Sequence, residues 1–398
     1  MKIAIISDWH LGLNWGSDLE FDSFAQLSQA FEQIKSKDVD LILVAGDLFD
    51  KKDPNHEVYY EAIKLLNNVD TENKINLKNA EGMILKIPML SIFGNHEFKG
   101  KDYKSTVELL EVIGFLKVLH ATSVKIGDVN VFGLGGVPDR YAKDILNKFN
   151  PLPVPNEYNI LMVHQSFKEY LPFDSEDMLS LSNLPANFNL IINGHLHWNI
   201  VVDLEQGGKF MMPGSTVSTQ NKKLEADKPK GFYLLDTNTN NLVFEEIKNT
   251  RPIFYIDLKF NKVDIQTITL EIRKRLTEIN NKKYNKKPMV RVRIKGDLEE
   301  GYFSKDLDLK KIELEFPELY LSFSNKIDEK RLKESLEKLK ELQTKKANVE
   351  GISREIFFEQ LKQTQFSNSF DSQRLFELLY NKDLEKAKDI ILDKDSKI

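Results

Sequence analysis

Five short apolar runs, each followed at once by histidine, aspartate or asparagine, constrain the fold of this chain more than any other feature. The runs predict buried strands at residues 2–7, 39–45, 88–93, 158–163 and 188–192. The residues that follow them include two aspartates, one asparagine and five of the seven histidines in the chain. Because the carboxyl ends of strands in an open α/β sheet share one edge, we expect these side chains to meet there.

Helical patterns alternate with these strands and favour an α/β fold. Apolar residues recur at intervals of three and four from Phe21 to Ile34, and further helices are predicted at 57–68 and 102–113. After residue 124, segments with Gly-Asp, Gly-Gly and Asn-Asn turns predict a second, more antiparallel sheet that packs on the first. The expected fold class is a two-sheet α/β sandwich.

The pattern changes near the Arg251-Pro252 pair. Three strands and one helix then predict a small α+β domain, and the rest of the chain is highly charged and helical. We therefore predict three parts, with the boundaries 1–250, 251–325 and 326–398.

Metal binding in this chain must depend on histidine, aspartate, glutamate and asparagine, because cysteine is absent. A single histidine at a strand end is more often a hydrogen-bonded structural residue, but five such patterns in series are hard to explain structurally. Buried polar groups are costly without partners, and bound cations satisfy them. Carboxylate with imidazole suits two divalent ions such as manganese or iron, and paired ions suit phosphoester hydrolysis. The candidate residues are Asp8, His10, Asp47, Asn95, His96, His164, His195 and His197.

The motif order closely resembles the calcineurin-like metallophosphoesterase superfamily. The motifs stand here as Asp8/His10, Gly46-Asp47-Leu48-Phe49-Asp50, Gly94-Asn95-His96-Glu97, His164 and Gly194-His195-Leu196-His197. The resemblance implies that one ion is bound by Asp8, His10 and His197. It also implies that Asn95, His164 and His195 bind the second ion, and that Asp47 bridges the two.

The two residues that follow Asn95 have different expected roles. By resemblance, His96 is the catalytic residue, which approaches the scissile phosphate and protonates the leaving oxygen or stabilises the transition state. Glu97 either orients His96 or is a solvated carboxylate, and we favour the second interpretation.

Four features point to a narrower group: His10-Leu11-Gly12, the block Gly46-Asp47-Leu48-Phe49-Asp50, the turn at 212–216 and the Arg251-Pro252 junction into the small α+β domain. Together they resemble the nuclease subunit of the double-strand-break repair complex, or meiotic-recombination-eleven family, with bacterial SbcD as its counterpart. The resemblance implies a manganese-dependent DNA phosphodiesterase with exonuclease and endonuclease action in DNA repair. Two residues depart from the family pattern: Asp50 stands where many members have a histidine linked to DNA-end processing, and Glu97 stands where aspartate is commoner.

The segment from Arg273 to Lys295 contains ten basic residues and one acidic residue. Such a segment either contacts DNA phosphates or forms a solvated surface, and next to a phosphodiesterase site we favour DNA. We expect residues 251–325 to form a capping, DNA-binding domain.

Two protein partners are implied by the resemblance. The last part of the chain has a leucine stripe and a loop-like segment at 365–369, and it resembles a helix–loop–helix that docks on an SMC-like coiled-coil ATPase. A homodimer is also implied, through the helices at 57–68 and 102–113. The residues Val58, Tyr59, Ala62, Ile63 and Leu66 form either that dimer face or the inner face of their helix. The leucine stripe consists of Leu332, Leu336, Leu339 and Leu342.

Two other functions stay open at this point. One is a metallophosphatase or small-nucleotide phosphodiesterase, which would not need roughly 150 residues after the catalytic domain. The other is a DNA-binding scaffold without catalysis, which would not need His96 beside two metals. The first apolar run is too short for a signal peptide, and no later run approaches roughly 20 residues, so we expect neither a signal peptide nor membrane association. We expect an intracellular, cytoplasmic protein associated with the nucleoid.

Overall fold

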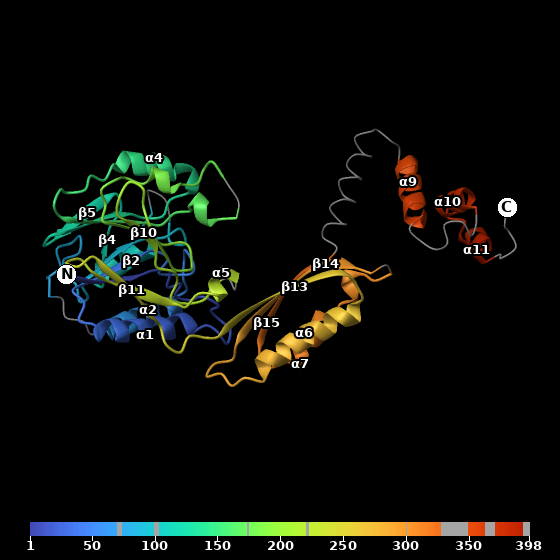
Figure 1. The fold of residues 1–398 in the computed structure, drawn as a ribbon, viewed down its shortest axis with the longest axis horizontal. Helices are drawn as coiled ribbons and strands as arrows, with labels where there is room; N and C mark the ends of the chain where they lie inside the picture. The colour runs from blue at the N-terminus through green and yellow to red at the C-terminus, as the bar shows by residue number, and fades with distance from the viewer. Residues whose placement is uncertain are drawn as a thin grey trace. The chain divides into compact units, whose positions relative to one another are not determined.

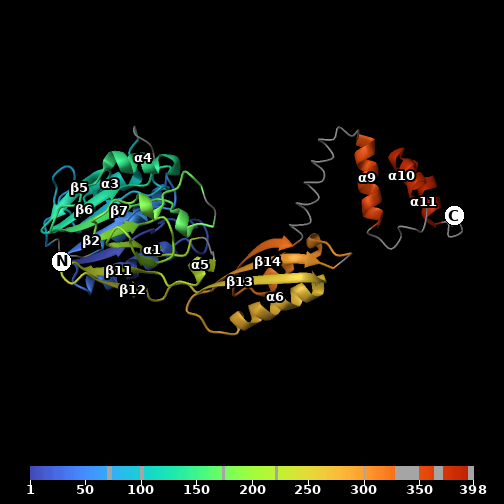
Figure 2. The same ribbon diagram turned by 45° about the horizontal axis from the view of Figure 1, so that its top comes forward.

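The computed structural model describes residues 1–69, 74–98, 103–172, 175–219, 223–299, 301–327, 349–362 and 371–392 (Figure 1). Its first part is a sandwich of two mixed six-stranded sheets with helices on both outer faces (Figure 1), and Figure 2 gives a turned view of it. The predicted α/β sandwich is therefore confirmed.

The first sheet contains three of the five predicted strands. Its order is β12-β11-β1-β2-β3-β4, in which β1 to β4 run parallel and β11 pairs antiparallel with β1. We expected the hairpin formed by β11 and β12 to lie in the second sheet, and that prediction was wrong. The edge of β1 from Lys2 to Ile5 is free on one side, and β11 pairs with it there. The strands are β1 (Lys2–Ile6), β2 (Leu41–Ala45), β3 (Met89–Ile92), β4 (Lys117–Val118), β11 (Gly231–Asp236) and β12 (Asn241–Glu246).

The second sheet contains the other two predicted strands, β7 and β8. Its order is β5-β6-β7-β8-β10-β9, and β6, β7, β8 and β10 all run parallel. Only the pairs β5–β6 and β9–β10 are antiparallel here, and the first sheet also has two antiparallel pairs, β1–β11 and β11–β12. The expectation that the second sheet is more antiparallel than the first was therefore wrong. The sheet is covered on both faces, which is the usual setting of parallel strands. The strands are β5 (Thr122–Ile126), β6 (Val129–Leu134), β7 (Tyr158–Val163), β8 (Leu190–Asn193), β9 (Ile200–Asp203) and β10 (Lys209–Met212).

Alternation along the strands divides the apolar side chains among three layers. In β1, Ile3 and Ile5 face the second sheet, whereas Ala4 and Ile6 face the helices α1, α2 and α3. The helix α4 covers the outer face of the second sheet. The helices of this part are α1 (Asp22–Lys35), α2 (His56–Asn67), α3 (Thr106–Ile113), α4 (Asp139–Phe149) and α5 (Lys223–Ala226), with short 3₁₀ turns at Lys168–Tyr170 and Leu181–Asn183.

A three-stranded sheet, β13-β14-β15, follows this sandwich. Along the helix α6, Ile268, Ile272 and Leu276 recur on one face and are buried. The elements are β13 (Ile253–Val263), α6 (Ile265–Asn280), β14 (Met289–Leu298), a 3₁₀ turn (Ser304–Asp306), α7 (Leu309–Glu315) and β15 (Tyr320–Ile327). The α+β content agrees with the prediction.

The described C-terminal residues form three helices, α9 (Val349–Lys362), α10 (Ser372–Tyr380) and α11 (Leu384–Leu392). The predicted leucine stripe and the segment 365–369 lie outside the described residues. The chain divides into two compact units, one of residues 1–257, 271–293 and 309–324 and one of residues 258–270, 294–308 and 325–398. The three-part division at residues 250 and 325 stays a prediction. Among the described helices, none combines the length and apolar character that a membrane span requires.

Candidate metal centre

Each predicted site residue lies in a loop directly after a strand. Asp8 and His10 follow β1, and Asp47 follows β2 in the same sheet. The remaining five follow β3, β7 and β8, so the site combines strand ends from both sheets rather than from one. These five are Asn95, His96, His164, His195 and His197.

The first group of donor atoms consists of Asp8, His10 and His197, whose ligand atoms all lie within 4.8 Å of one another. The Nε2 atoms of His10 and His197 are 3.2 Å apart. Asp8 Oδ1 is 4.0 Å from His10 Nε2 and 3.9 Å from His197 Nε2. Asp8 Oδ2 is buried and has no hydrogen-bond partner in the described part of the chain. A buried carboxylate oxygen without a partner is costly, and a cation would satisfy it.

The second group consists of Asp47, His164 and His195, with Asn95 between the two imidazoles. Asn95 Oδ1 is 3.0 Å from His164 Nε2 and 2.9 Å from His195 Nδ1. Asp47 Oδ2 is 3.2 Å from His164 Nε2 and 4.0 Å from His10 Nε2, so this carboxylate lies against both groups. The residues in both groups fit divalent cations.

The loops hold these side chains in uncommon backbone conformations. Asp8, His10, Asp47 and His195 have φ values of 51°, 46°, 51° and 77°, in the left-handed region. Such strain clusters at functional sites, where surrounding contacts maintain it. Glycine is required beside them, because a Cβ on Gly94 would lie 2.0 Å from Asp47 Oδ1.

Burial and the neighbouring charges shift the pKa values of the site histidines in opposite directions. Burial alone would lower the pKa of His164, but the Asp47 carboxylate outweighs it and raises that pKa to about 9. Burial, together with the charge of His164, lowers the pKa of His195 to about 4, and burial also lowers that of His197. His195 and His197 are therefore neutral at pH 7 with lone pairs available to a metal. Burial raises the pKa of Asp8 to about 6.

His96 is attached at both its backbone and its ring. Its N–H donates to Asp47 Oδ1 at 3.0 Å, and its Nδ1 donates to the carbonyl oxygen of Asp50 at 2.5 Å. The ring centroid lies 5.0 Å from that of His10. Because Nδ1 is engaged, Nε2 is the ring atom left to exchange a proton with a substrate.

Glu97 corrects one expectation. We favoured a solvated carboxylate, but the side chain is fully buried. Its Oε1 accepts from the Phe49 N–H at 2.7 Å and its Oε2 from the Gly94 N–H at 2.8 Å. Burial, together with the Asp47 charge, raises the pKa of Glu97 to about 8. Glu97 therefore ties the loops after β2 and β3 together, and no hydrogen bond to His96 exists among the described residues.

Asp50 is a further site residue whose role the motifs did not predict. Its Oδ1 lies 3.5 Å from His10 Nδ1, while its carbonyl holds His96. The sequence marked this position in two ways, as the second aspartate of Gly46-Asp47-Leu48-Phe49-Asp50 and as a place where many members of the resembled family have a histidine.

The residues considered for a dimer face on α2 point inward. Val58, Ala62 and Leu66 are buried in the core under the first sheet, and Tyr59 and Ile63 pack against the same core. The inner-face alternative is thus the one that the structure supports.

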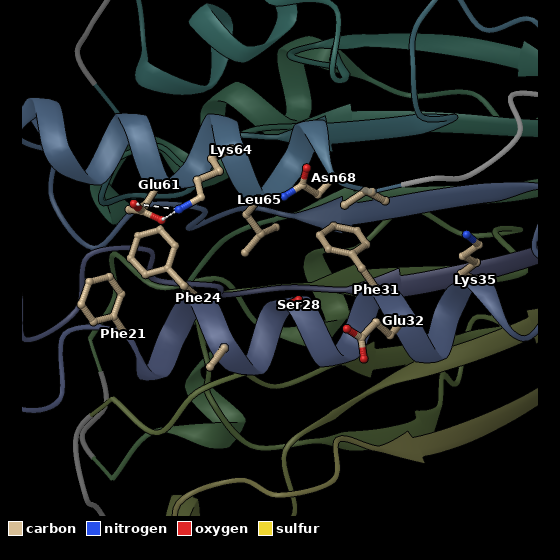
Figure 3. A pocket seen from close by; sticks show the side chains of 12 residues that line it. Phe21, Phe24, Ser28, Phe31, Glu32, Lys35, Glu61, Lys64, Leu65 and Asn68 are labelled. Carbon is tan, nitrogen blue, oxygen red and sulfur yellow. Dashed lines mark hydrogen bonds and ion pairs between the residues drawn. The ribbon is translucent and has the colours of Figure 1, made fainter.

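A groove of about 560 Å³ lies between α1 and α2. Figure 3 shows Phe24 and Phe31 of α1 near Leu65 of α2, beside the ion pair of Glu61 and Lys64. None of the residues that line this groove is a predicted metal ligand, so it is separate from the metal centre.

The sequence pattern of the family described as calcineurin-like phosphoesterase matches residues 1–199, which contain every residue of both donor groups. The chain belongs to this family, and the family is one of hydrolases that use divalent metals. The earlier resemblance is therefore confirmed.

The chain is similar to the "DNA double-strand break repair protein Mre11" of Saccharolobus solfataricus, with 29% identity over 306 residues that cover 75% of this chain and 76% of the relative. The protein of the same name from Sulfolobus acidocaldarius is 26% identical over 337 residues, 82% of this chain and 83% of the relative. The "Double-strand break repair protein MRE11" of Arabidopsis thaliana is 25% identical over 316 residues, 65% of this chain and 43% of the relative.

Proposed function

We propose that this chain is a metal-dependent DNA phosphodiesterase that acts, as exonuclease and endonuclease, in the repair of double-strand breaks. One observation carries the proposal: the Asp47 carboxylate lies against both donor groups, and the backbone N–H of His96 is hydrogen-bonded to the same carboxylate. The names of the relatives, which describe double-strand break repair proteins, support DNA as the substrate.

In this proposal, Asp8, His10 and His197 would hold one cation, Asn95, His164 and His195 would hold another, and Asp47 would be shared between them. Two bound cations, with manganese as the expected metal, supply charge stabilisation and water activation for an in-line displacement at phosphorus. The protein fixes the ligands through strained loops and hydrogen bonds. His96 Nε2 gives a proton to the leaving oxygen, and its Nδ1 contact with Asp50 keeps the ring oriented.

The basic segment supports DNA binding less strongly than its composition suggests. Arg273 pairs with Glu315 at 2.6 Å, Arg275 with Glu271 at 2.8 Å, and Lys286 lies 3.8 Å from Asp22. These acidic partners neutralise part of the cluster. We assign the phosphate contacts to exposed lysines of the segment, namely Lys274, Lys282 and Lys283.

We also propose three relations that rest on the family resemblance. The C-terminal helices dock on an SMC-like coiled-coil ATPase, the chain forms a homodimer, and the complex acts on DNA inside the cell, at the nucleoid. The proposed division of labour assigns catalysis to residues 1–250, capping of DNA to 251–325 and partner binding to 326–398.

The test is hydrolysis by the purified full chain with manganese, with and without chelator. The substrates are an end-labelled DNA duplex, an aryl phosphodiester and para-nitrophenyl phosphate. Manganese-dependent cleavage of DNA with little monoester hydrolysis is the expected result. Hydrolysis of the small esters with intact DNA would indicate the phosphatase-type alternative. DNA binding without any hydrolysis would indicate a scaffold.

A further inference from the structure

A buried ion pair contacts the backbone of His197 and belongs to none of the sequence motifs. Lys230 and Glu225 are 6% and 2% exposed, and Nζ of the lysine is 2.8 Å from Oε1 of the glutamate. Removing two charges from water is expensive, and an apolar pair of similar size is often at least as stable. The contacts of this pair therefore point to a role other than stability alone.

The ammonium group of Lys230 uses all three of its donors. Besides Glu225, it donates to the backbone carbonyl of His197 at 2.9 Å and to Ser215 Oγ at 2.8 Å. Ser215 Oγ in turn donates to the carbonyl of Val217 at 2.6 Å. The ammonium thus connects the peptide group of His197 to the turn that leads to Thr219.

The carboxylate of Glu225 is connected to the ring of His197 through Thr219. Glu225 Oε1 accepts from the Thr219 N–H at 2.7 Å and from the Thr219 hydroxyl at 3.3 Å. Thr219 Oγ1 is also hydrogen-bonded to Nδ1 of His197. A hydroxyl has one proton to donate. When that proton points to Glu225, Oγ1 is an acceptor toward His197, so the ring proton must lie on Nδ1.

This arrangement leaves Nε2 of His197 unprotonated, and Nε2 is the atom that lies near His10 and Asp8. We propose that the Lys230–Glu225 pair and Thr219 position His197, holding it as the Nδ1–H tautomer with the Nε2 lone pair presented to a divalent cation. The inference rests on the proposed function. Partners of this kind change metal affinity by about 10- to 100-fold.

The test compares Thr219→Val, which removes the hydroxyl at nearly constant volume, with Thr219→Ser, which keeps it. Thr106→Val is the matched control, because Thr106 is a buried threonine remote in sequence whose Oγ1 has no hydrogen-bond partner among the described residues. In the full chain with chelator, ¹⁵N NMR of labelled histidine should show His197 protonated at Nδ1. Titration of Mn²⁺, followed by electron paramagnetic resonance, gives the affinity of each site.

We expect Thr219→Val to give mixed tautomers of His197 and to weaken one Mn²⁺ site by about 10- to 100-fold. Thr219→Ser and Thr106→Val should retain the tautomer and the affinity. Glu225→Gln keeps the shape of the Glu225 side chain and should also weaken that Mn²⁺ site. This variant provides a second test if Thr219→Val folds poorly.

Two results overturn the inference without touching the proposed function. One is a wild-type His197 protonated at Nε2, and the other is unchanged tautomer and affinity in both Thr219→Val and Glu225→Gln. A wild-type chain that binds no Mn²⁺ would instead overturn the metal centre itself, and the inference with it.

Discussion

Asp47 Oδ2 lies 3.2 Å from His164 Nε2, and this contact joins the end of β2 in one sheet to the end of β7 in the other. The same oxygen lies 4.0 Å from His10. One carboxylate thus couples the two donor groups, and the sandwich brings together ligands that a single sheet edge would not.

Asp47→Asn should therefore weaken Mn²⁺ binding at both sites, because the amide removes the charge that both groups share. Isothermal titration calorimetry with Mn²⁺ measures how many ions bind and how tightly. Asp47→Asn should also lose more hydrolytic activity than any variant that removes one proposed histidine ligand. Asp203→Asn is the control, since Asp203 is 83% exposed and forms an ion pair only with Lys209 among the described residues. Loss of a single site in Asp47→Asn, with the other at full affinity, would contradict the bridge.

His96→Asn should lower the rate of hydrolysis by about 10²- to 10⁴-fold while Mn²⁺ affinity stays unchanged. The reason is that Nε2 of His96 is the proposed proton donor, and His96 is not among the proposed metal ligands. Single-turnover cleavage of labelled DNA and Mn²⁺ titration provide the two measurements. His56→Asn, at an exposed position on α2, is the control. A matching fall in metal affinity would make His96 a ligand instead.

Much of the candidate metal centre could be predicted from the sequence, because each proposed ligand follows a strand whose apolar run is visible by itself. The sheet to which β11 and β12 belong could not be predicted, since it depends on which strand edge remains free after folding. Glu97 was misjudged for a related reason. A carboxylate beside a histidine gives no local sign that the backbones of Phe49 and Gly94 will enclose it. The role of the Lys230–Glu225 pair could not be predicted from the sequence either, because the residues that it contacts lie between residues 197 and 219, in a separate part of the chain.

Without metal, the free energy of unfolding should fall as pH rises from about 6.5 to 9. The pKa of His164 is about 9 in the folded chain against an ordinary 6.5, and that of Glu97 is about 8 against 4.5. In this window the folded chain holds protons that the unfolded chain has lost, so raising the pH favours unfolding. Urea unfolding with chelator at three pH values measures the slope.

Two comparisons check the cause of that slope. Glu97→Gln cannot titrate and should flatten the fall below about pH 8. Saturating Mn²⁺ should reverse the trend, because the ligands bind metal in their deprotonated forms. Stability of the chelated chain that rises across this window would show that the buried groups are not protonated as described.

The C-terminal helices offer a surface on which the partner proposal can be tested apart from catalysis. Leu375 and Phe376 of α10 are buried, whereas Leu384 and Ile391 of α11 are 64% and 54% exposed. Exposed apolar side chains on a helix suit docking on a coiled coil. Leu384→Glu combined with Ile391→Glu should abolish capture of the SMC-like ATPase and leave Mn²⁺-dependent DNA cleavage unchanged.

The control for this double variant is Lys388→Glu, which changes an exposed charge on the same helix. It should retain ATPase capture, because its side chain adds no apolar contact. Circular dichroism verifies that α11 remains helical in each variant. Capture that survives Leu384→Glu with Ile391→Glu would exclude this face as the docking surface, and parallel loss of DNA cleavage would show that the C-terminal helices do not act as a separate module.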